Sequence, residues 1–103
     1  MTIQTEVQGF EADVQLLRTV EQRVSKLRKF FHHINEVQVI LKLENLGFMK
    51  DRIAEIKVHV PNGIFFSKES AMSFEGALSK ALISLKLKLL SYGARRIIYR
   101  LHS

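Results

Sequence analysis

Two alternating apolar runs separated by Pro61-Asn62-Gly63 constrain the fold of this chain more than any other feature. The first run alternates from Ala54 to Val60, and the second reads IFFSKE from residue 64. A period of two is typical of a strand with one buried face. Proline followed by Asn-Gly favours a tight turn, because proline presets one turn angle and Asn-Gly tolerates positive φ. The sequence therefore predicts a hairpin formed by these two strands.

Two more runs share this period. Residues 2–8 alternate from Ile3 to Val7, and residues 37–44 alternate from Val37 to Leu43. The segment ENLGFMKD, residues 44–51, is expected to be a loop around Gly47. The chain thus contains four predicted strands, and the last three follow one another directly.

Two apolar stripes with helical spacing flank these three strands. Asp13 is the expected N-cap of the first helix and Ser73 that of the second, since both residue types accept hydrogen bonds from free amides of a first turn. Gly93 argues against continuation of the second helix as far as Arg95. The first stripe is Leu16, Leu17, Val20, Val24, Leu27 and Phe31, and the second is Phe74, Ala77, Leu78, Ala81, Leu82, Leu85 and Leu89.

The order β-α-β-β-β-α predicts an α+β fold, a four-stranded sheet with two helices packed on one face. We expect a single domain over residues 1–103, with a core at 2–92 and a basic, apolar C-terminal tail at 93–103. The chain has no Cys, no apolar run near the roughly 20 residues of a membrane span, and no secretory signal. These features predict a cytoplasmic protein that does not bind membranes.

Nothing in the sequence predicts an enzyme or a metal centre. His32 and His33 are adjacent, so on a helix they point about 100° apart, and no acid or Cys at ligand spacing completes a site. The serines lack a glycine elbow, and no glycine-rich phosphate loop is present. We therefore expect no catalytic residue, no cofactor and no metal, and we interpret His32-His33 as the corner between a helix and a strand.

Basic residues are concentrated in the helices and the tail. The net charge is +6, and residues 71–103 carry six Lys and Arg against Glu75 alone. Lysine and arginine contact phosphates by charge, without reading base sequence. The pattern favours a polyanionic partner bound between two basic helix rims, whereas the alternative is a surface that is basic only for solubility.

The stretch KLRKFFHHINEVQVILKLE, residues 26–44, resembles the helix-to-strand corner of the ribosome hibernation-promoting factor and ribosome-associated inhibitor family. VQGF, IKVHVPNG and GALSKALISLKLKLL extend the resemblance over residues 2–92. It implies a fold similar to a double-stranded-RNA-binding domain and, given the chain length, a short form of the family. It also implies translation inhibition: binding to ribosomal RNA of the small subunit in the mRNA and tRNA channel, and ribosome silencing in stationary phase or stress.

The resemblance also implies which residues bind RNA. Ser84 and Ser91 depart from the family pattern, which usually has lysine at both places, and His32 replaces a common acid. The tail after Gly93 is not the lysine-rich end usual in the family. The implied RNA-binding residues are Arg23, Lys26, Arg28, Lys29, Lys80, Lys86, Lys88, Arg95 and Arg96.

Two other functions stay open from the sequence. One is a general double-stranded-RNA-binding domain. The other is a protein-interaction module that has lost ribosome binding, which the two serines and the apolar tail motivate. For the leading hypothesis the expected partner is the small subunit and not DNA, and the protein is expected to be a monomer off the ribosome.

Overall fold

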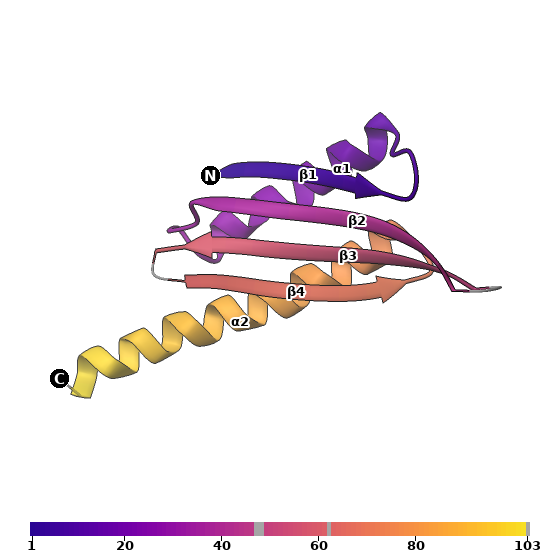
Figure 1. Cartoon of the computed structure of the whole chain (residues 1–103). Coiled ribbons are helices and arrows are strands. Elements are labelled where there is room, and N and C mark those ends of the chain that lie inside the picture. The colour runs from indigo at the N-terminus through magenta and orange to yellow at the C-terminus, as the bar shows by residue number, and fades with distance from the viewer. Residues whose placement is uncertain (47–48, 62, 103) are drawn as a thin grey trace.

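One sheet, in the strand order β1-β2-β3-β4, carries both helices on the same face (Figure 1). This computed structural model describes the backbone of residues 1–46, 49–61 and 63–102, and the side chains of residues 1–45, 51–61 and 63–92. The predicted α+β fold and its β-α-β-β-β-α order are confirmed. The elements are β1 (Thr2–Gln8), α1 (Val14–Ser25), a short 3-10 helix η1 (Lys26–Lys29), β2 (Glu36–Leu46), β3 (Met49–Val60), β4 (Gly63–Ala71) and α2 (Phe74–His102).

The strand pairing makes the sheet mixed. β1 runs parallel to β2, and α1 with η1 forms the crossover between them, whereas β3 is antiparallel to both β2 and β4. Alternate residues of β2 and β3 point to the helices and form the core with α2. The predicted β3–β4 hairpin is confirmed by the pairing of Val60 with Gly63. Asn62 lies outside the described residues.

Both predicted N-caps are present. The Leu16 amide donates to the Asp13 carboxylate at 2.7 Å. The Gly76 amide donates to the Ser73 hydroxyl at 3.0 Å. These bonds satisfy backbone donors that the first turn of a helix leaves free, so the two helices begin where the sequence places them.

Most residues of the two predicted apolar stripes are buried between the helices and the sheet. In α1 and η1 the buried members are Val20, Val24 and Leu27, whereas Leu17 is 37% exposed. The first helix also ends earlier than its stripe indicates, because α1 stops at Ser25 and tightens into η1 before the chain turns toward β2. In α2 five predicted members are buried: Ala77, Leu78, Ala81, Leu85 and Leu89.

Two boundary predictions are wrong. Residues 44–46 and 49–51 of the expected loop belong to β2 and β3, which pair up to Leu46 and Met49. Gly47 lies outside the described residues. The charged segment Glu44 to Asp51 hides the strand pattern, but cross-strand hydrogen bonds extend a hairpin whatever the local propensity.

Gly93 also does not end α2, which continues to His102. Glycine inside a helix costs only about 1 kcal/mol relative to alanine. Neither a proline nor a second glycine follows Gly93 to stop the helix.

Gly9 determines how the chain leaves the sheet. Its φ is +84°, and a Cβ atom there would lie 2.6 Å from the Leu43 carbonyl oxygen of β2. Only glycine adopts such a backbone conformation cheaply while approaching another strand so closely. The connection from β1 to α1 therefore lies directly against the backbone of β2 at Leu43.

Candidate functional site: a basic helix face

Charge is distributed unevenly between the two sides of the sheet. Among the described side chains of the helices, Glu21 and Glu75 are the only acids, against eight Lys and Arg. On the other side of the sheet, strand alternation places more acids than bases. We call the first side the helix face; the described bases of its helices are Arg18, Arg23, Lys26, Arg28, Lys29, Lys80, Lys86 and Lys88, and strand alternation adds one base and one acid, Arg52 and Glu69. We call the second the outer sheet face; its charged residues are Glu6, Glu36, Lys42, Glu44, Asp51, Glu55, Lys57 and Lys68.

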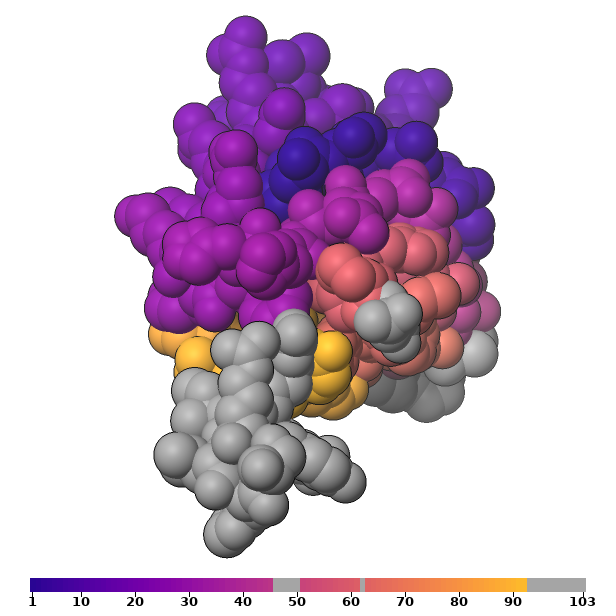
Figure 2. All heavy atoms as spheres, turned by 90° about the vertical axis from the view of Figure 1, so that its left-hand side faces the viewer, coloured from indigo at the N-terminus to yellow at the C-terminus, as the bar shows by residue number. Residues whose placement is uncertain are grey.

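The cations of η1 meet α2 at one place. Lys26, Arg28 and Lys29 are exposed, and residues three apart in a 3-10 helix lie on the same side. The Lys86 ammonium of α2 lies 4.1 Å from the centre of the Phe30 ring, just after η1, in a cation–π contact. In Figure 2 the purple residues of α1 and η1 adjoin the orange residues of α2. The structure thus places Lys86 of α2 beside the end of η1, which carries Lys26 and Lys29, whereas Arg28 lies on the β1 side of η1.

Arg23 has a different position from the other predicted RNA-binding residues. Its guanidinium donates to the Glu75 carbonyl at 3.3 Å and to the Ser79 hydroxyl at 3.0 Å. These bonds join α1 to the first turns of α2, and the side chain is half-buried. Arg23 therefore helps to fix the spacing of the two helices, and its half-buried guanidinium is less accessible to a ligand than the exposed lysines are.

Lys80 and Lys88 point to the opposite side of α2 from Lys86. Their ammonium groups donate to backbone carbonyls of β4, Lys80 to Ser70 at 3.2 Å and Lys88 to Phe66 at 2.6 Å. β4 is an edge strand, so these lysines cover part of its unpaired backbone. The predicted lysines of α2 thus do not form one row, and two of them stand beside the sheet edge.

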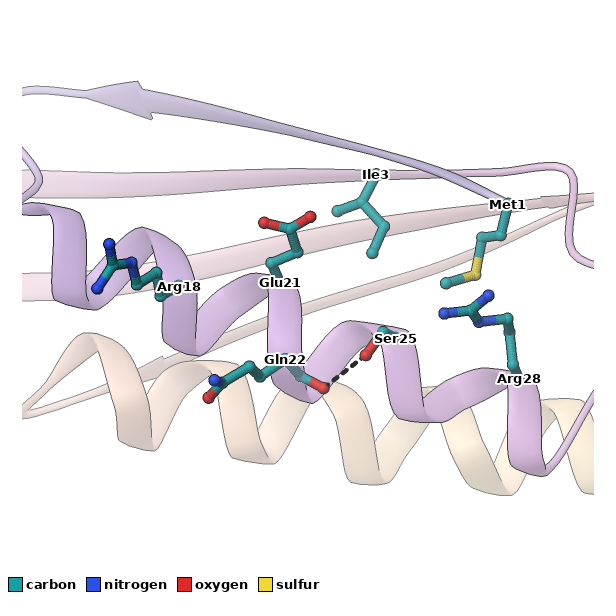
Figure 3. A pocket seen from close by; sticks show the side chains of 7 residues that line it. All are labelled: Met1, Ile3, Arg18, Glu21, Gln22, Ser25 and Arg28. Atoms are coloured by element: carbon teal, nitrogen blue, oxygen red, sulfur yellow. Dashed lines mark hydrogen bonds between the residues drawn. The ribbon is translucent and has the colours of Figure 1, made fainter.

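Arg18 is a basic residue that the sequence hypothesis left out of the RNA-binding set. With Arg28, Glu21 and Met1 it lines a hollow of about 430 Å³ between α1 and β1. Figure 3 shows Arg18 and Arg28 toward the two ends of this hollow, with Glu21 between them. Spacing along α1 could have found it, since residues 18, 22, 25 and 29 follow one line of the helix. Arg95 and Arg96 belong to α2, and their side chains lie outside the described residues.

The histidine pair lies at the corner that the sequence indicates. His32 and His33 are exposed in the connection from η1 to β2, and the His33 ring stands edge-on to Phe31 with centroids 6.1 Å apart. Within the described part of the chain, no three metal-ligating side chains gather at one place. For the same residues, no helix is both long and apolar enough to cross a bilayer.

The structure is thus an α+β domain in which two basic helices cover one face of a single sheet. The chain belongs to the Sigma 54 modulation protein / S30EA ribosomal protein family, which matches residues 3–97. It is thus a member of a family of ribosome-associated proteins. No curated protein matches the chain.

Solved structures share the fold. A ribosomal subunit interface protein from Coxiella burnetii has a TM-score of 0.81 and 18% identity, over 91% of this chain and 99% of that one. The N-terminal domain of Protein Y from Thermus thermophilus has a TM-score of 0.75 and 20% identity, over 89% of this chain and 99% of that one. At such identities the likeness establishes the architecture.

Proposed function

We propose that this protein binds the small ribosomal subunit through its helix face and silences ribosomes in stationary phase or stress. The observation that supports this most is what the helix-face lysines contact: a ring and carbonyl groups, and no acid of the described chain. Lys86 contacts an aromatic ring, and Lys80 and Lys88 contact neutral carbonyls. Among the described side chains, the one ion pair, Lys42 with Glu55, is on the outer sheet face. These helix-face lysines are therefore not neutralised by an acid of the described chain, and their charge is available to an external anion such as an RNA phosphate.

The proposed mechanism is occlusion. A rigid domain that places its basic face on ribosomal RNA in the mRNA and tRNA channel excludes tRNA and mRNA by occupying the same space. No chemical step is required, so the proposed mechanism involves no enzymatic activity. The proposed place of action is the cytoplasm, where ribosomes are. The residues proposed to contact RNA are Lys26, Arg28 and Lys29 of η1 and Lys86 of α2, then Arg23, Lys80, Lys88, Arg95 and Arg96.

Co-sedimentation with isolated small subunits tests this proposal. We expect saturable binding that excess tRNA displaces. Because released counterions drive phosphate binding, affinity should fall by about a thousandfold or more between about 50 and 200 mM salt if six or more phosphates are contacted. An arbitrary RNA duplex of matched length is the control. Equal affinity for the duplex would favour a general double-stranded-RNA binder, and absence of binding at low salt would refute the proposal.

A further inference from the structure

The two edge strands of the sheet differ in how their outer backbone groups are covered. On β4 the Lys80 and Lys88 ammonium groups donate to two backbone carbonyls. On β1 no side chain of the described residues makes such a contact, and the strand contains no Lys, Arg or Pro; its one charge is Glu6. Lysine and proline are residues that commonly protect an edge strand from pairing. β1 is therefore the open edge of this sheet.

The pairing of β1 with β2 identifies the open backbone groups. The Thr2 amide donates to the Asn35 carbonyl at 3.3 Å, so the backbone groups of Thr2 point toward β2. Because this direction alternates along a strand, the amides and carbonyls of Ile3, Thr5 and Val7 point away from β2. In the part of the chain that the structure describes, no strand pairs with this side of β1. These groups are a row of alternating donors and acceptors that an added strand would satisfy.

The hollow between β1 and α1 lies beside this open edge (Figure 3). Met1 and Ile3 line it on the β1 side, whereas Arg18 and Arg28 stand toward its two ends. Neither arginine is in the one ion pair found among the described side chains. Glu21, between the arginines, is the one acid of the lining. A strand added to β1 would direct every second side chain to the helix side, where these groups lie.

We propose that the open edge of β1 binds an extended acidic segment of another protein by strand addition. The segment pairs with the backbone of Ile3, Thr5 and Val7 and directs two carboxylates, four residues apart, to the two arginines. Residues four apart in a strand are separated by about 13 Å. Residues 18 and 28 are separated by about 15 Å along the helix axis, so the two spacings match. The side chain between the carboxylates is uncharged and apolar, because it lies near Glu21 and Ile3.

The backbone row favours a protein segment over RNA and over a second copy. Phosphates accept hydrogen bonds and donate none, so an RNA backbone would leave the outward carbonyls of β1 unpaired. Copies of a chain with net charge +6 repel each other. The residues that β1 directs to the helix side, Ile3, Thr5 and Val7, also include no carboxylate to meet the arginines of another copy.

Amide hydrogen exchange followed by NMR tests the proposal on the natural chain. The probe is a synthetic peptide in which threonines alternate with a glutamate, a valine and a second glutamate. In the free protein the Thr5 amide should exchange faster than the Gln4 amide, which points to β2. Peptide at millimolar concentration should slow the exchange of Thr5 and leave Gln4 unchanged. Unchanged exchange of Thr5 overturns the proposal.

A second peptide tests the charge of the occupant. It has lysine at both glutamate positions and is otherwise identical. Its affinity should be lower by about tenfold or more, because its cations meet Arg18 and Arg28. Equal affinity of the two peptides would overturn the assignment of an acidic segment.

Thr5→Pro is the test variant and Thr5→Val its matched control. Proline removes the outward amide of residue 5 and no hydrogen bond to β2, whereas valine keeps that amide. Thr5→Pro should lower the affinity for the glutamate peptide about tenfold, and Thr5→Val should stay within about twofold of the natural chain. Circular dichroism checks that both variants are folded. Equal affinities of the two folded variants overturn the proposal.

Arg18→Gln keeps the test decisive if Thr5→Pro does not fold. It should lower the affinity for the glutamate peptide several-fold and leave that for the lysine peptide no weaker; an unchanged affinity for the glutamate peptide contradicts the proposed contact. The proposal does not rest on ribosome binding, so Thr5→Pro should bind small subunits like the natural chain. Loss of that binding by the folded variant would assign the edge to the ribosome. A dimer of the natural chain that Thr5→Pro abolishes would assign it to a second copy.

Discussion

The helix face and the outer sheet face lie on opposite sides of the same four strands, but their cations make different contacts. On the outer sheet face the Lys42 ammonium lies 2.6 Å from the Glu55 carboxylate, with both side chains partly buried. On the helix face Lys80, Lys86 and Lys88 contact carbonyls and a ring, none of which neutralises a cation. One cation of the outer sheet face is thus paired with an acid of the same chain, whereas none of these three helix-face lysines is. We expect a cation without an acid partner in the chain to be more available to an anionic ligand than a paired one.

Charge reversal on each face tests this contrast most strongly. Lys26→Glu with Lys29→Glu changes the helix face, and Lys57→Glu with Lys68→Glu changes exposed residues of the outer sheet face. Both double variants lower the net charge equally. The first should weaken binding to small subunits about a hundredfold and reduce the slope of log affinity against log salt by about two.

The outer-face variant should stay within about threefold of the natural chain, since it removes no phosphate contact. Binding is measured by co-sedimentation over a salt series. Equal losses from the two double variants would mean that net charge alone drives binding, and the contrast between the faces would fail.

Gly9→Ala tests how far the helix face depends on the crossover from the sheet. At a φ of +84° and with the Leu43 carbonyl oxygen 2.6 Å from the added Cβ, the variant is strained and must shift the crossover. We expect the free energy of unfolding to fall by about 2 kcal/mol. Gly63→Ala is the control, because there the nearest atom is the Val60 Cγ2 at 3.9 Å. Urea denaturation measures both, and similar stabilities would show that the crossover is not constrained.

The smallest expected effect concerns the ion pair of the outer sheet face. The hydrogen bond that Lys42 donates to Glu55 raises the pKa of Lys42, with smaller electrostatic contributions from Glu55, Glu44 and Glu6, while burial opposes the shift. A lysine whose pKa is raised on folding stabilises the fold below its unfolded pKa, about 10.4, and loses that contribution as pH rises through the folded pKa.

Glu55→Gln should therefore lower the unfolding temperature at neutral pH, and its difference from the natural chain should shrink in strongly alkaline solution. Glu36→Gln, on the same face, is the control. Thermal unfolding followed by circular dichroism at both pH values decides the matter. A difference that is unchanged in alkaline solution would show that the pair does not act through the Lys42 charge.

The sequence alone was sufficient for the local features of the fold. Asp13 and Ser73 cap helices where predicted, and the Pro61 turn joins two strands, because these outcomes depend on residues close together in the chain. The expected loop at 44–51 and the break at Gly93 were wrong for the complementary reason. Pairing with a neighbouring strand and continuation of an established helix outweighed local preference.

The tertiary structure alone decided what each lysine of α2 contacts. The sequence places Lys80, Lys86 and Lys88 on one basic helix, and helical periodicity states only their relative angles. Packing of Leu78, Leu85 and Leu89 on the sheet sets the rotation of α2 about its axis. That rotation brings Lys86 to Phe30 and turns Lys80 and Lys88 to the edge of β4. Composition and periodicity determine which groups a helix carries, whereas contacts between distant segments determine what each group meets.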